Sequence, residues 1–255
     1  MRRPSLMVTE VAAGVHVLGS LRFNWYVVEQ GGRFTVVDAG LPAHWAQLGA
    51  LLEWFGEDLS SVEAVLLTHG HADHAGNAER IRDGCGASVY AHPADWPDVR
   101  SGRLPRPTAA QVLRLVRPSW LTFTVEMARG GAMRFPPVQE LSELEDGAAL
   151  DVPGRPRVVA VPGHTAGSCA LHLPAGGVVF TGDALVTLNP AARAPVRRGP
   201  QLACDAFQED AAQALASLAR LEALDAHTVL PGHGEPWTGG VGEAVQRARA
   251  LGRLP

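Results

Sequence analysis

The stretch Thr68-His69-Gly70-His71-Ala72-Asp73-His74 decides how this chain folds and what it holds. It contains four metal-ligand side chains and directly follows the apolar run Val65-Leu66-Leu67, which is typical of a buried strand. His69 and His71 share the parity of an extended segment, so both can point the same way. Asp73 and His74 follow in the expected turn and can face a second point in space, so this one motif can serve two adjacent metal ions. Because imidazole and carboxylate ligands suit zinc or iron better than magnesium or calcium, the stretch predicts a metal centre.

Three other apolar runs are each followed by a turn and one ligand-type residue. They are Val158-Val159-Ala160-Val161 before Pro162-Gly163-His164, Val178-Val179-Phe180 before Thr181-Gly182-Asp183, and Thr228-Val229-Leu230 before Pro231-Gly232-His233. A lone histidine after a strand is more often structural than a ligand, and a histidine-rich turn can be a polar loop. Taken as a set, however, these positions supply seven ligands, which is what a two-metal site needs.

Together with Asp38 in Val36-Val37-Asp38-Ala39-Gly40, these motifs resemble those of the metallo-β-lactamase superfamily, in the same order along the chain. The resemblance runs from Asp38 to His233 and implies an α/β fold, a four-layer αββα sandwich with a glyoxalase II-like core and metals at one edge. It also implies the ligand assignment. The first metal takes His69, His71 and His164, the second takes Asp73, His74 and His233, and Asp183 bridges the two.

The pattern of apolar runs predicts two similar halves. In the first half, a hairpin over 25–37 ends at Asp38, a helix follows through 45–52, and a strand over 62–67 ends at His69. In the second half, a hairpin over 169–180 ends at Asp183, a helix follows from about 207 to 224, and a strand over 228–230 ends at His233. We expect one domain over residues 1–255, with an insertion at about 92–156 that the repeat does not explain.

Two segments outside the repeat are candidates for the substrate pocket. The apolar run 112–127 within the insertion predicts an extra helix packed on the core, or a lid or pocket wall over the metals. The loop 185–203 carries Arg193, Arg197 and Arg198. Charged loop residues are usually only solvated, but an arginine here would suit a forked contact to a substrate carboxylate or phosphate. An apolar wall and a cationic loop favour an acyl substrate with an anionic end.

Composition narrows the class of protein. The 255 residues are 46% hydrophobic and 19% charged, as expected for a globular protein, and the net charge of −4 gives no reason to expect nucleic acid. All 22 basic residues are arginine, which excludes lysine-based Schiff-base chemistry. No signal-peptide core or long apolar segment occurs. We therefore expect a soluble, cytoplasmic enzyme with a small-molecule substrate and no membrane partner; the sequence does not predict its oligomeric state.

The predicted centre favours hydrolysis. Two Zn²⁺ ions, or iron or manganese in their place, can share a hydroxide, because paired charges lower the pKa of bound water. Asp73 is expected to be catalytic, as a ligand that also takes or gives the water's proton. Asp38 is expected to support catalysis by orienting a ligand histidine through its other ring nitrogen. The predicted reaction is hydrolysis of an ester, thioester, lactone or amide bond.

Two alternatives stay open at this point. One is a mononuclear iron oxygenase resembling persulfide dioxygenases, which use a triad of the His69, His164 and Asp183 type. The other is a non-catalytic metal-binding protein. Within the superfamily, Asp183 stands where many zinc β-lactamases carry cysteine, so β-lactam hydrolysis is not favoured. Glyoxalase II adds a helical glutathione-binding domain, for which this chain leaves little room.

Overall fold

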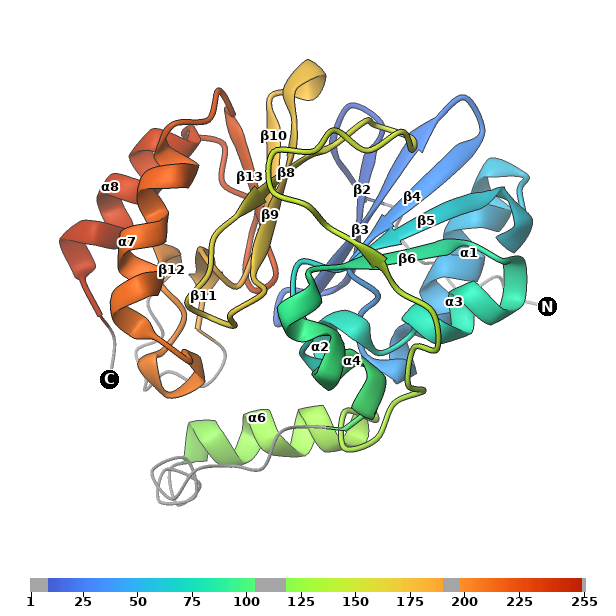
Figure 1. Cartoon of the computed structure of the whole chain (residues 1–255), viewed down its shortest axis with the longest axis horizontal. Coiled ribbons are helices and arrows are strands. Elements are labelled where there is room, and N and C mark those ends of the chain that lie inside the picture. The colour runs from blue at the N-terminus through green and yellow to red at the C-terminus, as the bar shows by residue number, and fades with distance from the viewer. Residues whose placement is uncertain (1–8, 104–117, 190–197, 254–255) are drawn as a thin grey trace.

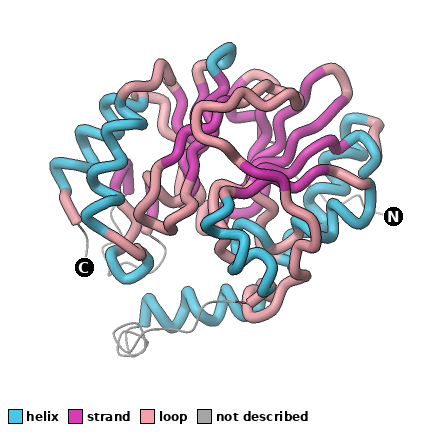
Figure 2. The backbone as a smooth tube through the Cα atoms, in the orientation of Figure 1, coloured by secondary structure: helices cyan, strands magenta, loops and turns pink. Residues whose placement is uncertain are grey.

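The computed structural model describes residues 9–103, 118–189 and 198–253 (Figure 1). Two β-sheets face each other, and helices cover the outer face of each sheet (Figure 2). This is the αββα arrangement that the family resemblance implies, and the predicted fold class is confirmed.

The first sheet carries the first half of the chain. Its seven strands in the described residues follow sequence order: β1 (Thr9–Ala12), β2 (Val15–Ser20), β3 (Phe23–Gln30), β4 (Arg33–Val37), β5 (Val62–Leu66), β6 (Ser88–Ala91) and β7 (Ser142–Glu143). The strands are antiparallel from β1 to β4 and parallel from β4 to β7. Side chains alternate as a pleated strand requires: Trp25 and Val27 face the helices, and Tyr26 and Val28 face the second sheet.

The second sheet repeats that plan. In spatial order it contains β13 (Thr228–Pro231), β10 (Val178–Gly182), β9 (Cys169–Leu173) and β8 (Arg157–Ala160). The β9–β10 hairpin is antiparallel and β10 pairs in parallel with β13, as the β3–β4 hairpin is followed by the parallel β4–β5 pair. A small separate sheet pairs β11 (Val186–Leu188) with β12 (Arg198–Gln201). The predicted hairpins and closing strands are therefore present in both halves.

Helices complete the outer layers. The described α-helices are α1 (Trp45–Phe55), α2 (Ala72–Ala75), α3 (Ala78–Cys85), α4 (Trp96–Ser101), α6 (Pro118–Arg129), α7 (Ala211–Glu222) and α8 (Val241–Leu251). Apolar side chains of α1 and α3 pack on the first sheet, and those of α7 and α8 pack on the second. α7 begins at Ala211 instead of about residue 207 because the Asp210 side chain caps it, accepting hydrogen bonds from the backbone N–H of Ala212 and Gln213.

The insertion supplies more than an added helix. α6 is the described part of the predicted helix; residues 112–117 lie outside the described residues. The Phe123 ring on α6 lies 5.8 Å from the Phe23 ring of the first half and 5.5 Å from the Phe207 ring of the second half. α6 therefore contacts both halves of the chain, and it lies below them in the view of Figure 1. The insertion also provides β7, and Leu144 is buried between the sheets.

None of the described helices combines the length and the apolar character that a membrane span requires.

Candidate metal centre

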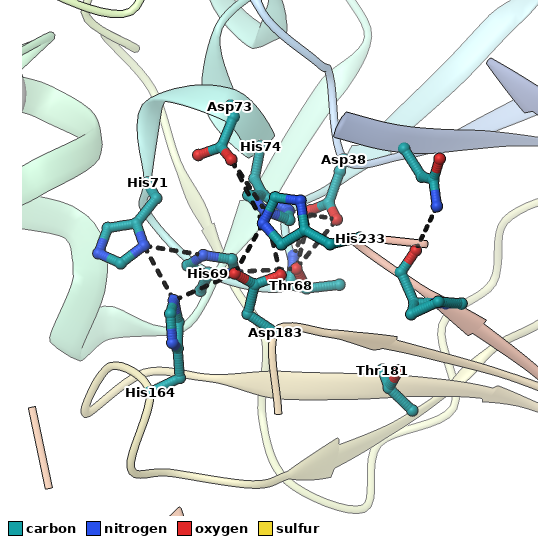
Figure 3. A network of polar contacts seen from close by, with 12 residues as sticks. Asp38, Thr68, His69, His71, Asp73, His74, His164, Thr181, Asp183 and His233 are labelled. Atoms are coloured by element: carbon teal, nitrogen blue, oxygen red, sulfur yellow. Dashed lines mark hydrogen bonds and ion pairs between the residues drawn. The ribbon is translucent and has the colours of Figure 1, made fainter. Parts of the chain in front are cut away.

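The seven predicted ligands come together at one rim of the sandwich (Figure 3). Each ligand-bearing turn follows the carboxyl end of a strand. His69 and His71 follow β5, His164 follows β8, Asp183 follows β10 and His233 follows β13. Asp73 and His74 lie in the short helix α2, one turn further along. The two sheets bring their strand ends to the same edge, which is why residues as distant in sequence as Asp73 and His233 meet there.

Three histidines form one ligand set, His69, His71 and His164, called here the three-histidine set. His71 Nδ1 lies 3.1 Å from His69 Nε2 and 3.0 Å from His164 Nε2. In a neutral imidazole, Nδ1 of His71 carries either one proton or one lone pair, so it can form a good hydrogen bond with only one of these two nitrogens. Nitrogens bound to one tetrahedral zinc at about 2.0–2.1 Å lie roughly 3.3 Å apart, so the spacing fits a shared cation.

Asp73, His74 and His233 form the second set. Asp73 Oδ2 lies 3.6 Å from His233 Nε2 and 3.8 Å from His74 Nε2. Asp73, His74 and His233 are all buried. The imidazole and carboxylate donors match those that zinc and iron accept.

Asp183 lies between the two sets. Its Oδ2 is 3.0 Å from His233 Nε2 and 3.5 Å from His164 Nε2, and its Oδ1 is 3.5 Å from His74 Nε2. Asp183 Oδ1 and His74 Nε2 are buried and form no hydrogen bond. Buried polar atoms are nearly always paired. These two atoms are therefore suited to a cationic partner, and the residues present fit a metal ion at this place.

Asp38 supports two histidines from behind the ligand sets. Its Oδ2 lies 2.8 Å from His74 Nδ1, and its Oδ1 accepts a hydrogen bond of 2.8 Å from the Thr68 N–H. The Thr68 hydroxyl contacts both Asp38 and Nδ1 of His69, at 3.0 and 3.2 Å. These contacts direct Nε2 of His69 and of His74 toward the centre. They are the contacts that the predicted role of Asp38 requires, and the role itself stays a prediction.

The His233 loop is held by Asn24 of β3 in the first half and by Arg22, the residue just before β3. His233 Nδ1 donates to the Arg22 carbonyl, which fixes the tautomer with Nε2 facing the site. Asn24 is buried and donates from Nδ2 to the carbonyls of Pro231 and Gly234, at 3.0 and 2.6 Å. Nothing in the sequence around Asn24 singles it out, because Pro231 is 207 residues away.

Two glycines allow the halves to approach this closely. A Cβ on Gly232 would lie 2.5 Å from Asp183 Oδ1, and a Cβ on Gly182 would lie 2.5 Å from Thr68 Oγ1. Gly182 also has a φ of +50°, which favours glycine. The glycines of the Thr181-Gly182-Asp183 and Pro231-Gly232-His233 motifs are thus required by close contacts around the site.

The electrostatics divide the two sets. Burial lowers the pKa of His164 to about 3, and burial together with neighbouring histidines holds the pKa of His69 well below its usual value. Burial also acts against protonation of His74, but the charges of Asp38, Asp73 and Asp183 outweigh it and raise the pKa of His74 to about 10. The pKa of His233 is likewise raised, because Asp183 outweighs burial. These pKa shifts thus favour protonation of His74 and His233 and oppose protonation of His69 and His164.

The predicted cationic loop is described only in part. Arg198 forms an exposed ion pair with Glu235, with 3.1 Å between Nη1 and Oε1. Arg193 and Arg197 lie outside the described residues.

The family model of the metallo-β-lactamase superfamily matches residues 22–233, a range that includes every ligand described above. The chain belongs to the metallo-β-lactamase superfamily. The predicted family is therefore confirmed, and the superfamily's known association with divalent metals agrees with the ligand sets.

Two relatives carry names that bear on function. The chain is 29% identical to a probable metallo-hydrolase, YflN, of Bacillus subtilis, over 90% of this chain and 87% of that protein. It is 28% identical to a hydroxyacylglutathione hydrolase of Cereibacter sphaeroides, over 78% of this chain but only 56% of that protein. Both relatives are thus named as hydrolases.

Two solved structures are similar in fold and in sequence. A metallo-β-lactamase family protein of Thermus thermophilus is 30% identical, with a TM-score of 0.68 over 95% of this chain and 80% of that one. The protein TTHA1623, in a di-iron-bound form, is also 30% identical, with a TM-score of 0.59 over 88% of this chain and 94% of that one.

Proposed function

We propose that this protein is a dinuclear metal-dependent hydrolase that cleaves an ester, thioester, lactone or amide bond. The observation that carries the proposal is the position of Asp183, whose two oxygens face His74, His164 and His233 from both ligand sets. A carboxylate in this position suits two neighbouring cations better than one. The relative bound to two irons supports the same metal count.

His69, His71 and His164 would hold one ion, and Asp73, His74 and His233 the other, with Asp183 shared. Two divalent cations in this place would supply Lewis acidity and lower the pKa of water. Zinc is the metal we propose, because nitrogen ligands dominate; iron fits the same donors.

The chain's own residues supply the proton chemistry and the alignment. Asp73 directs Oδ2 toward the two histidines, and its other oxygen points away from them (Figure 3). In the proposed reaction, that second oxygen, Oδ1, accepts a proton from the attacking water and returns it to the leaving group. Asp38 and the Arg22 carbonyl hold His74 and His233 in the orientation that the reaction needs.

The substrate proposed is an uncharged or anionic acyl compound of low molecular weight. Phe123 of α6 stacks on Phe23, and Phe23 packs edge-on against His233 with 5.8 Å between ring centroids. This row of rings supports an apolar wall beside the second set. No nucleic-acid or membrane partner is proposed.

The test combines metal content with turnover. Purified protein is stripped with chelator, reloaded with zinc, iron or manganese, and analysed for bound metal. It is then assayed against a panel of aryl esters, acyl thioesters and lactones. We expect close to two ions per chain and hydrolysis that disappears with chelator and returns with metal.

Other outcomes would favour the alternatives. One tightly held iron with oxygen uptake, and no second ion at any zinc concentration, would favour the mononuclear oxygenase. Two bound ions with no hydrolysis across the panel would favour a non-catalytic metal-binding protein.

A further inference from the structure

Asp95 is a buried carboxylate that none of the predicted motifs includes. It ends the 3₁₀ turn Pro93–Asp95, directly before α4, and is 2% exposed. Among the residues that the structure describes, it forms no ion pair with a basic side chain. A buried carboxylate needs hydrogen-bond donors in place of water. Asp95 obtains them from two loops that both carry metal ligands.

The first donor lies between two histidines of the three-histidine set. The N–H of Gly70 donates to Asp95 Oδ2 at 2.8 Å. Gly70 separates His69 from His71, so this bond fixes the turn that sets their spacing. The approach is close: a Cβ on Gly70 would lie 3.2 Å from the Asp95 Cβ.

The other donors come from the loop that carries the third histidine of that set. The Thr165 hydroxyl donates to Asp95 Oδ2 at 2.8 Å, and the Gly167 N–H donates to Asp95 Oδ1 at 2.9 Å. Thr165 directly follows His164. A Cβ on Gly167 would lie 2.4 Å from Asp95 Oδ1, so glycine is required at this position. One carboxylate thus joins a loop of the first half to a loop of the second half.

We propose that Asp95 is a positioning residue for the three-histidine set, holding His164 at the correct distance from His69 and His71. This inference rests on the proposed metal binding. The Asp95 carboxylate contacts only the two loops that carry the three-histidine set, among the hydrogen bonds described above. The second set has its own ties, from Asp38 to His74 and from the Arg22 carbonyl to His233. Asp95 should therefore affect one metal and not the other.

The test is Asp95→Asn, which keeps the shape of the side chain. Each carboxylate oxygen accepts at least one N–H or O–H, so an amide NH₂ in place of either oxygen faces a donor and breaks the link on that side. Zinc affinity is measured by competition with a chromophoric chelator in two backgrounds. His233→Ala leaves the three-histidine set intact, and His164→Ala leaves the second set intact.

In the His233→Ala background, we expect Asp95→Asn to weaken binding of the remaining ion on the order of 10–100-fold, as for other residues that orient ligands. In the His164→Ala background we expect no further change. Equal loss in both backgrounds would reduce Asp95 to a general structural residue, and no loss in either would overturn the proposal.

Two further variants keep the test sharp. Thr165→Val removes one of the three donors and keeps Asp95, so it should show the same selectivity with a smaller loss even if Asp95→Asn does not fold. Asp58→Asn is the matched control, because Asp58 also accepts from a backbone N–H and a hydroxyl, both of Ser60, on the protein surface. The experiment measures zinc affinity and does not depend on turnover. Failure of the hydrolase proposal would appear separately, as metal-loaded wild-type protein without activity.

Discussion

Asp183 Oδ2 lies 3.0 Å from His233 Nε2, and the other oxygen of the same carboxylate lies 3.5 Å from His74 Nε2. Asp183→Ala should therefore lower the occupancy of at least one metal and reduce hydrolysis by orders of magnitude, since two nearby cations lose their shared negative charge. Metal analysis and steady-state kinetics of the reloaded variant measure both effects. Asp151→Ala, at an exposed surface position, is the control. Wild-type turnover with reduced metal content would show that the shared carboxylate is not needed.

Asp38→Asn tests the support behind the histidines. Asp38 has a φ of +59°, a region that asparagine also tolerates, so the backbone should be kept while the carboxylate is lost. Because Asp38 contacts His74 directly and His69 through Thr68, we expect a loss on the order of 10–100-fold in zinc affinity or activity. Unchanged zinc titration and rate would leave Asp38 as a turn residue only.

Zinc binding to the second set should depend on pH. A metal needs the free lone pair of His74 Nε2, so it competes with the proton that the raised pKa of about 10 retains. Below that pKa the apparent affinity of this set should rise with pH, by about tenfold per unit for one displaced proton. The three-histidine set should bind with little dependence on pH above neutrality, because burial lowers the pKa of His164 to about 3. Titrations between about pH 6.5 and 8.5 in the His164→Ala and His233→Ala backgrounds compare the two sets; equal slopes would contradict the prediction.

Asn24→Ala should destabilise the fold. The buried Asn24 amide donates two hydrogen bonds to the His233 loop, and their loss leaves two carbonyls without this partner. We expect the free energy of unfolding to fall by about 2–4 kcal/mol, measured by urea denaturation of metal-free protein. Gln139→Ala, an exposed amide that donates to the Pro137 carbonyl, should change it by less than about 0.5 kcal/mol. A change at Asn24 as small as this would show that the Asn24 amide does not stabilise the contact between β3 and the His233 loop.

Arg198→Ala tests the substrate proposal at the described end of the cationic loop. If Arg198 exchanges Glu235 for an anionic substrate group, the variant should raise KM for anionic esters several-fold, to about tenfold, and spare neutral esters of the same acyl chain. Arg220→Ala is matched, since Arg220 is also an exposed arginine paired with one acid, Asp146. Equal effects on charged and neutral esters would leave Arg198 as a solvated surface residue.

The two halves and the positions of the candidate ligands at strand ends could be predicted because both depend on short, local stretches of sequence. Apolar runs of strand length end at Asp38, His69, Asp183 and His233, and the structure has strands at those places. Asp95 and Asn24 could not be predicted in this way. Asp95 meets Gly167 across 72 residues and Asn24 meets Pro231 across 207, so their roles depend on how the sheets pack and not on neighbouring sequence. The start of α7 is set by the Asp210 cap, a local signal that the apolar spacing alone does not locate.

The hydrogen bonds of Asp95 and Asn24 affect whether a variant loses its metal before it unfolds. They fasten the His164 and His233 loops to the first half, whereas the sheets themselves meet largely through apolar side chains such as Val28 and Phe180, whose contacts are non-directional and tolerate small sliding. Ligand geometry tolerates only about half an ångström. Zinc affinity should therefore respond to smaller shifts between the two sheets than the free energy of unfolding does. A variant with a slightly shifted interface would persist as a folded, protease-resistant and metal-poor protein.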